Sequence, residues 1–303
     1  MNPNRLRAYT QLLIVAVIWG IAGPVIKLTL AKLPADIFIL YRFFISAVVA
    51  LVFFLVQGIR LPKNPKTLFQ LFVYCLLNSS ITLGLLFWGV SKTSLLDMSL
   101  ISLFGPLLMV LFGFVFLKDR ITVREKVGTF IAFLGAIVIG IAPILKTDHG
   151  SGQFLGNILI FASLLAGAIT GVLVKKLMRE GISPNTLANL SFIVGFITFL
   201  PFVLLKNGPA LTLNLIVSAP FPYQLGVFYM ALISGNLAYI LNNMGQKTIE
   251  LSEAAPFAYL YPIFSGILAV FLLGDKLTIP IIIGSVITLV GVIIAEYKKK
   301  ISF

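Results

Sequence analysis

Two basic residues stand inside long apolar stretches of the sequence, where a charge must meet a partner or face water. Lys27 lies in the apolar run 10–31, and Arg42 lies in the run 36–57. Membrane-embedded cations normally face the protein interior or a water-filled cavity, because exposing a charge to lipid is costly. Arg42 is suited to a bidentate contact with a carboxylate, which makes an anchor for an anionic ligand group one interpretation. The alternative is snorkelling to the headgroups, or a structural pair with Asp36.

Polar side chains form a stripe along each of two apolar segments. Along 223–245 and just beyond they recur every three or four residues, and along 67–89 every four, which places each set on one helical face. Facing stripes of this kind line a wet cavity that binds polar groups, or they form bonds between helices that fix packing. The first stripe consists of Asn236, Tyr239, Asn243 and Gln246, and the second of Tyr74, Asn78 and Thr82.

Aromatic residues occur near the same segments. The candidates for the wall of an apolar pocket are Trp19, Trp88, Tyr259 and Tyr261. Trp and Tyr are equally common at membrane interfaces, so that interpretation stays open. Trp19 lies near the middle of its apolar run and is the strongest candidate for the cavity.

Acidic residues, histidine and cysteine are placed where they offer little chemistry. None of the ten acidic residues lies in the middle third of an expected helix, and the sole histidine, His149, is in a loop. The single Cys75 excludes an intramolecular disulfide and a cysteine-based metal site. We therefore expect no catalytic residues, no metal site, no cofactor and no proton relay.

The composition indicates a protein that crosses the membrane many times. Of 303 residues, 59% are hydrophobic and 11% are charged, whereas soluble proteins carry about 25% charged residues. A spanning helix needs about 20 apolar residues, and alternating polarity typical of a β-barrel is not evident. The expected helices are 10–31, 36–57, 67–89, 95–117, 125–144, 154–175, 186–206, 223–245, 252–273 and 278–297.

The basic residues predict the orientation, because Lys and Arg in short loops accumulate on the cytoplasmic side. With the N-terminus inside, sixteen of the 23 fall on the inner side and five on the outer side. Both termini are therefore expected in the cytoplasm, with the chain in the cell membrane. No basic stripe interleaved with aromatics occurs, so a nucleic acid partner is not expected.

The two halves of the chain repeat each other. An offset of 156 residues aligns identical residues of the two halves: Pro106 with Pro262, Asp119 with Asp275, Gly128 with Gly284, and Gly135 with Gly291. The same offset aligns the acids Asp97 and Glu253. An offset of 148 residues aligns Lys27 with Lys175. Five helices are an odd number, so the second repeat enters the membrane from the opposite side. We predict an all-α integral membrane protein with ten transmembrane helices, built as two inverted five-helix repeats, 1–146 and 152–303, around a central cavity.

The repeated prolines and glycines have distinct expected roles. Pro106 and Pro262 each remove a backbone hydrogen bond in mid-helix, so they mark a hinge or helix break at the functional site, or a structural kink. Gly128 and Gly135, with their counterparts, line one face of the helices 125–144 and 278–297 and allow close approach. Packing within the chain is the favoured interpretation, and a homodimer through these glycine faces is the expected oligomer if one forms.

These motifs resemble the EamA-type members of the drug/metabolite transporter superfamily. The resemblance spans nearly the whole chain and depends on Trp19-Gly20 followed by Lys27, Tyr41-Arg42-Phe43, Gly105-Pro106, the turn Lys118 to Thr122, and the repeated Tyr261-Pro262 and Gly274 to Thr278. It implies a ten-helix basket whose cavity is lined by helices 1, 3, 4, 6, 8 and 9 and which exports amino acids or other small metabolites. The family often has Glu at Asp119 and Asp275, and helix 7 lacks a counterpart of Arg42.

The leading hypothesis is a secondary transporter, an exporter or facilitator that moves amino acids or similar small metabolites by alternating access. Facilitated or potential-driven movement is favoured over proton exchange, because the spans hold no acid at their centres. The alternatives are a structural or regulatory membrane protein without transport, and a membrane-embedded transferase. A transferase needs paired carboxylates for Mg²⁺ or a nucleophile with a base, which the sequence does not offer, so the protein is not expected to be an enzyme.

Overall fold

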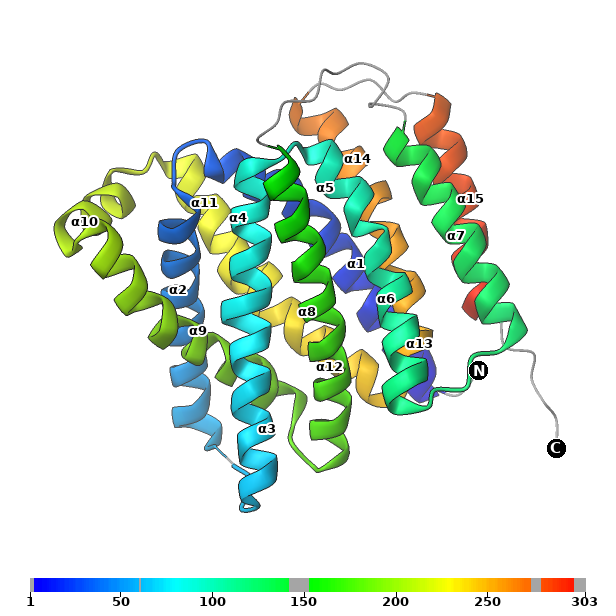
Figure 1. Cartoon of the computed structure of the whole chain (residues 1–303), viewed down its shortest axis with the longest axis horizontal. Coiled ribbons are helices and arrows are strands. Elements are labelled where there is room, and N and C mark those ends of the chain that lie inside the picture. The colour runs from blue at the N-terminus through cyan, green and yellow to red at the C-terminus, as the bar shows by residue number, and fades with distance from the viewer. Residues whose placement is uncertain (1–2, 60, 142–152, 274–278, 297–303) are drawn as a thin grey trace.

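Helices make up every regular element in the described part of the chain (Figure 1). The computed structural model describes residues 3–59, 61–141, 153–273 and 279–296. The expected repeat boundary at 146–152 and the second acidic turn at 274–278 lie outside these residues.

Seven of the described helices are long and apolar enough to cross a membrane. They are α1 (Pro3–Leu30), α2 (Ala35–Gln57), the continuous helix of α3 (Pro65–Cys75), η1 (Leu76–Leu83) and α4 (Gly84–Lys92), the segment Leu100–Leu117, α8 (Gln153–Arg179), α9 (Pro184–Asn207), and the continuous helix of α11 (Phe221–Phe228), η4 (Tyr229–Leu237) and α12 (Ala238–Thr248). Each overlaps a span that hydropathy predicts. The all-helical membrane class is therefore confirmed.

The three remaining expected spans are also helical. They are α7 (Val123–Ile141), the series α13 (Leu251–Ala254), η5 (Ala255–Leu260) and α14 (Tyr261–Leu273), and α15 (Ile279–Glu296). The count of ten spans stays a prediction. A short helix that the sequence analysis missed, α10 (Pro209–Ser218), follows α9 directly.

Local sequence explains where two of these helices begin and end. Ser183 precedes α9, and its side chain accepts the Thr186 N–H at 3.0 Å, while Pro184 occupies the first helical position, where no N–H is needed. Gly58 and Gly208 follow α2 and α9 with φ of +72° and +74°, a conformation that glycine adopts without a steric cost.

Four of the expected spans contain irregular turns in the described residues. The segments η1 and η4 are π-helical, with a wider turn than an α-helix. In the fourth expected span, α5 (Leu95–Ser102) and α6 (Phe104–Phe112, followed by η2, Gly113–Leu117) are separated at Leu103, three residues before Pro106. In the ninth, the 3₁₀ segment η5 ends two residues before Pro262. Proline disrupts a helix at this distance, because it clashes with the carbonyl four residues earlier.

The helices α7 and α15 lie side by side at one edge of the bundle (Figure 1). Their glycines face each other: a Cβ on Gly128 would lie 2.3 Å from the backbone nitrogen of Ala295, and one on Gly135 would lie 2.5 Å from that of Thr288. The two glycine faces are therefore occupied within one chain. This agrees with the interpretation of packing within the chain, and a homodimer stays a prediction.

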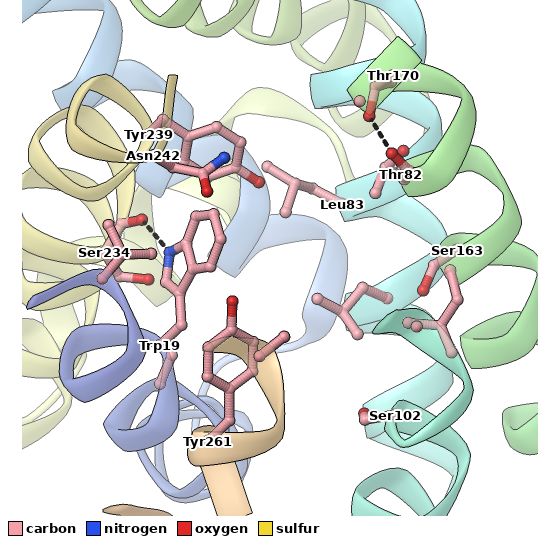
Figure 2. A pocket seen from close by; sticks show the side chains of 18 of the residues that line it. Trp19, Thr82, Leu83, Ser102, Ser163, Thr170, Ser234, Tyr239, Asn242 and Tyr261 are labelled. Carbon is pink, nitrogen blue, oxygen red and sulfur yellow. Dashed lines mark hydrogen bonds between the residues drawn. The ribbon is translucent and has the colours of Figure 1, made fainter. Parts of the chain in front are cut away.

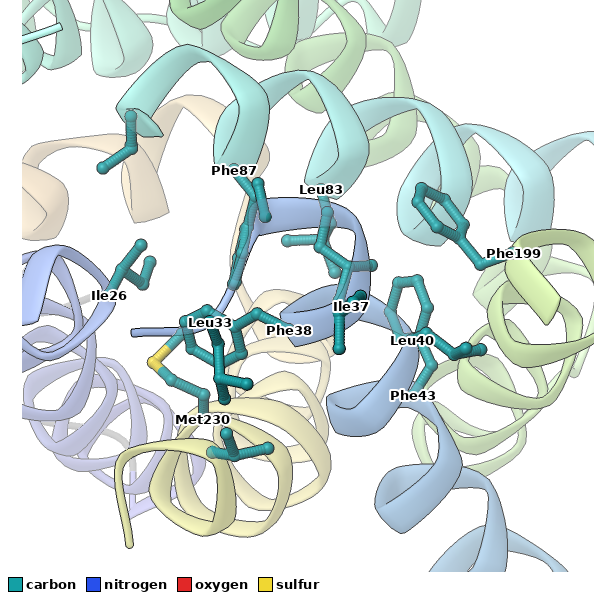
Figure 3. Packing of buried hydrophobic residues seen from close by; sticks show 14 of the residues in the cluster. Ile26, Leu33, Ile37, Phe38, Leu40, Phe43, Leu83, Phe87, Phe199 and Met230 are labelled. Carbon is teal, nitrogen blue, oxygen red and sulfur yellow. The ribbon is translucent and has the colours of Figure 1, made fainter. Parts of the chain in front are cut away.

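The largest apolar cluster joins α2 to α4, α9 and η4 (Figure 3). Phe38 stacks on Phe87 with ring centroids 4.9 Å apart, and Phe43 stacks on Phe199 at 5.5 Å. Apolar residues are also abundant on the outside, where Leu55 and Leu205 are 86% and 88% exposed. An apolar exterior of this kind suits a lipid environment.

Candidate functional site

A cavity of about 300 Å³ lies among the described helices. Its walls come from α1, η1, α4, α5, α6, α8, η4, α12, α13, η5 and α14, with the side chain of Arg42 added from α2. These segments correspond to the first, third, fourth, sixth, eighth and ninth expected spans. Nine residues selected from the sequence line it: Trp19, Arg42, Asn78, Thr82, Pro106, Tyr239, Asn243, Gln246 and Tyr261.

One wall of the cavity is aromatic. Trp19 contacts Tyr239 and Tyr261 edge-on, with ring centroids 5.2 Å and 6.1 Å away (Figure 2). The indole N–H of Trp19 donates to the backbone carbonyl of Ser234 at 3.0 Å, in the π-helical segment η4. This bond fixes the indole, so its ring presents a rigid apolar surface to the cavity.

Hydroxyl groups line the opposite wall, where Thr82, Ser102, Ser163 and Thr170 lie across from Trp19 and Tyr261 (Figure 2). The hydroxyls of Ser102, Ser163 and Thr170 donate to carbonyls of their own helices at 2.7 to 2.8 Å. Their oxygens keep lone pairs and can accept a bond from a ligand. The hydroxyl of Thr82 is buried and has no partner in the described part of the chain.

Amide side chains extend the polar surface along α12 and η1. Asn78 donates to the Ser191 hydroxyl at 3.1 Å, and Asn243 donates to the Pro184 carbonyl at 3.4 Å. Gln246 donates to the Asn242 side chain at 3.1 Å. Each of these amides uses one N–H in a hydrogen bond within the protein. Its carbonyl oxygen is the group best placed to accept a hydrogen bond from a ligand.

Arg42 is the cation of this cavity. Its side chain is 1% exposed, and the guanidinium lies over the rings of Phe87 and Phe192, with 5.4 Å and 6.0 Å from its central carbon to the ring centroids. Asp36, the alternative partner, instead accepts from Lys206 at 2.8 Å and Asn207 at 3.0 Å. Arg42 makes no ion pair or hydrogen bond with any described residue, and its Nε atom is buried without a partner.

Lys27 and Trp88 lie outside the cavity wall. The ammonium of Lys27 donates to the backbone carbonyls of Val90 and Thr93 at 3.1 Å and 2.6 Å, at the end of α4. The Trp88 ring packs against Phe199 and Phe202. Lys27 therefore satisfies carbonyls that a helix end leaves without partners, and Trp88 belongs to the apolar cluster.

Asn236, Tyr259 and Pro262 also lie outside the cavity wall. Asn236 is buried and donates to the Ser46 carbonyl at 3.2 Å and the Asn189 side chain at 3.0 Å, which joins η4 to α2 and α9. Tyr259 is 1% exposed and stacks on Phe133. These contacts of Asn236 and Tyr259 join neighbouring helices.

The resemblance implies that the sixth expected span, α8, lines the cavity, but the sequence analysis selected none of its residues for the cavity wall. Ser163, Gly167, Thr170 and Gly171 line the cavity from this helix. Successive members are four, three and one residue apart, so the sequence shows that they lie on one side of the helix. Small residues at such spacing in a membrane helix usually indicate close packing, and the cavity was therefore not inferred from them. Asn242, adjacent to the predicted stripe, was missed as well.

A cluster of polar groups joins α4 and α5 to α8 at one end of the bundle, and we name it the Asp97 cluster. The carboxylate of Asp97 accepts from Asn157 at 3.1 Å and from the Thr93 hydroxyl at 3.4 Å. Lys27 reaches the same turn through the Thr93 carbonyl. These described partners of the Asp97 carboxylate are all neutral.

A related cluster, the Glu253 cluster, joins α1 to α13, and α8 to the end of α12, at the opposite end of the bundle (Figure 1). Glu253 accepts from the Tyr9 hydroxyl at 2.6 Å and forms an ion pair with Arg5. Lys175 donates to the carbonyls of Gln246 and Ile249. At the repeat offsets, Lys175 corresponds to Lys27, Glu253 to Asp97, and Tyr9 to Asn157.

Two more acids tie the turn before α7 to this same end. Asp119 accepts the Ser252 N–H at 3.0 Å, and Glu250 accepts the Arg120 N–H at 3.1 Å. Burial and then the charge of Asp119 raise the pKa of Glu250 above its ordinary value. Asp275, the repeat counterpart of Asp119, lies outside the described residues.

Comparison with known proteins agrees with the arrangement of the helices. The profile of the EamA-like transporter family matches twice, over residues 6–141 and 154–297. The chain belongs to the EamA-like transporter family. The resemblance deduced from the motifs is therefore confirmed.

Relatives in this family are named as transporters. An uncharacterized transporter of Bacillus subtilis, YyaM, is 26% identical over 97% of this chain and 94% of its own length. Proteins named "Probable amino-acid metabolite efflux pump" from Escherichia coli and Salmonella typhimurium are 23% and 26% identical, each over 95% of this chain and 94% of the relative. A crystal structure of another protein shares the fold, with a TM-score of 0.75 and 15% identity over 96% of this chain and 97% of that one.

Among the described residues, no three side chains of His, Cys, Asp or Glu gather in a way that would hold a metal ion. The family and its named relatives indicate a membrane transporter rather than an enzyme.

Proposed function

We propose that this EamA family member is a secondary transporter of amino acids or similar small metabolites. The observation that carries the proposal is the cavity of about 300 Å³, with its aromatic wall, its wall of hydroxyls and its amide oxygens. Pockets that bind small molecules are largely apolar, with a few converging polar groups that orient the ligand. The named efflux pumps among the relatives support this substrate class.

We further propose that ten spans in two inverted repeats give alternating access. The two family matches and the equivalent contacts of Lys27 and Lys175 at opposite ends of the bundle support an internal symmetry. Inverted repeats of this kind let one half rock against the other around a fixed site. The interruptions before Pro106 and Pro262 are the proposed places of bending.

The proposed orientation has both termini in the cytoplasm, and hence the Glu253 cluster at the cytoplasmic end of the cavity. The asymmetry of basic residues supports it. A reporter enzyme fused after Lys300 should be active only in the cytoplasm. A signal from the opposite side would overturn the orientation without affecting the cavity.

Reconstitution tests the function. Purified protein in liposomes should exchange radiolabelled amino acids across the membrane faster than liposomes without protein. The two tryptophans provide a matched pair: Trp19→Ala removes the aromatic wall and should lower flux at least tenfold, whereas Trp88→Ala, outside the cavity, should retain most of it. Equal loss in both variants would remove the cavity from the transport route, and no flux of any small metabolite would favour a structural or regulatory role.

A further inference from the structure

We propose that the cavity selects net monoanionic carboxylates with an apolar body, and that Arg42 binds the carboxylate. This inference rests on the proposed function and narrows its substrate class: carboxylic acids without a free ammonium group should bind better than zwitterionic amino acids of the same skeleton.

The first step is the state of the guanidinium. Phe87 and Phe192 contact the cation through their ring faces, and such contacts stabilise the charge without using its N–H donors. No acceptor in the described part of the chain bonds to Arg42. Its planar fork of donors therefore remains for a ligand, and a carboxylate matches that geometry with two parallel bonds.

The second step concerns Lys27, the other candidate for the anion. Its ammonium is already bonded to the two carbonyls at the end of α4. Diverting Lys27 to a ligand would leave those carbonyls without partners, which is costly in a site shielded from water. The structure thus distinguishes the two cations, which the sequence offered equally as anchors for an anion. Lys27 is bonded to backbone carbonyls, whereas Arg42 has no hydrogen-bond partner among the described residues.

The third step is the charge balance of the cavity. Arg42 is the one formally charged side chain in the described wall, and no carboxylate lines it. A monoanion neutralises the buried cation. A zwitterion instead leaves the same net charge and adds an ammonium that only neutral oxygens and ring faces can meet. Charges are expensive to bury without a counter-ion, so the monoanion is favoured.

The remainder of the wall specifies the body of the ligand. Trp19, Tyr239 and Tyr261 present rings, and Leu86 and Leu164 add aliphatic surface. A branched aliphatic or aromatic acid would bury its body against these side chains, while the hydroxyls opposite them accept bonds from any hydroxyl or amide of the ligand.

Three compounds with one carbon skeleton test this preference: 4-methylpentanoate, leucine and 4-methylpentanamide. Binding is measured in purified Trp88→Phe protein, where the fluorescence of Trp19 alone reports on the cavity. We expect 4-methylpentanoate to bind at least tenfold more tightly than leucine or the amide. Equal affinity for the acid and its amide would overturn the role of Arg42, and tighter binding of leucine would overturn the charge argument.

Variants then test which residue causes the preference for the acid over the amide. Arg42→Gln should abolish the advantage of the acid over the amide, and Arg42→Lys, which keeps a charge but loses the fork, should retain only part of it. Lys27→Gln is the matched control and should leave the ratio unchanged. If Arg42→Gln does not fold, as judged by gel filtration, the partial loss in Arg42→Lys decides the question, and an unchanged ratio there contradicts bidentate binding.

Flux in liposomes separates this inference from the proposed function. Transport of leucine without preferential binding of 4-methylpentanoate would refute the carboxylate site and leave the transporter in place. Absence of flux for every compound, with preferential binding of the acid intact, would refute transport and leave the carboxylate site in place.

Discussion

Asp97 and Glu253 occupy equivalent positions at opposite ends of the cavity, yet their partners differ in charge. Asp97 accepts from the neutral groups of Asn157 and Thr93, whereas Glu253 is held by the Tyr9 hydroxyl and by the cation of Arg5. The lysines of the two clusters, Lys27 and Lys175, make the same kind of contact at both ends. The lysine contacts are thus alike at the two ends, and the charge of the partners of the acid differs.

We expect this difference to give the two ends unequal stability. An ion pair that is partly shielded from water stabilises its contact more than a bond to a neutral amide does. Under alternating access, the end with the Glu253 cluster should open less often than the end with the Asp97 cluster. Four sets of variants test this comparison, from the largest expected effect to the smallest.

The lysines should give the largest effect, on stability. Lys175 is 7% exposed, while Lys27 is only partly buried, so Lys175→Met leaves two carbonyls without partners in a drier place. We expect a loss of about 2–3 kcal/mol for Lys175→Met and about 1 kcal/mol for Lys27→Met, since an unsatisfied buried group costs roughly 1–3 kcal/mol. Thermal unfolding in detergent measures both. A larger loss in Lys27→Met would contradict the order of the two ends.

The acids should give the next effect, on access to the cavity. In a Cys75→Ala background, a cysteine placed at Ser102 reports on the cavity wall through its rate of reaction with an impermeant maleimide. Glu253→Gln removes the attraction for Arg5 and also weakens the bond from the Tyr9 hydroxyl, so it should raise labelling from that end about tenfold, equivalent to about 1.4 kcal/mol. Asp97→Asn keeps an acceptor for Asn157 and should raise labelling from its own end less, about threefold. Equal increases would show that the ion pair adds nothing.

Much of the fold was predictable, because lipid imposes long apolar helices whatever their tertiary contacts. Which polar side chains reach the cavity wall depends on local helix geometry. Asn236 was assigned to the cavity on the assumption of a regular helical period, but it lies in η4, whose wider turns rotate it toward Ser46 and Asn189. Tyr239 and Asn243 follow in the regular helix α12 and do line the cavity.

The different partners of the two cations, Lys27 and Arg42, could not be predicted from the sequence. Lys27 and Arg42 both stand in apolar runs, and only tertiary structure shows that Lys27 reaches the carbonyls of Val90 and Thr93 while Arg42 meets none. Which residues of α8 line the cavity could not be predicted for a different reason. Small residues serve both close packing and the wall of a cavity, and spacing alone does not distinguish these uses.

The two prolines provide a third test, through flux. Pro106 lines the cavity and Pro262 does not, although both follow an interrupted turn. Restoring the missing hydrogen bond with Pro106→Ala should straighten the helix at the wall and lower flux about fivefold. Pro262→Ala should lower it less, about twofold. Expression and gel filtration control for folding, and flux equal to that of the unaltered protein in both variants would reduce the prolines to packing features.

The smallest effect is expected from making the two ends alike. Asn157 contacts the carboxylate of Asp97 and is partly exposed, so Asn157→Arg gives Asp97 a cationic partner, as Arg5 is for Glu253. Partly exposed ion pairs contribute about 0.2–1 kcal/mol, so labelling of the Ser102→Cys reporter from the Asp97 end should fall about twofold to threefold. Arg5→Gln, the converse change, should raise labelling from the Glu253 end by a similar factor, and high salt should weaken both effects because it screens exposed charges. If Asn157→Arg leaves labelling unchanged while Arg5→Gln raises it, the Arg5 contact acts through its place on α1 and not through its charge.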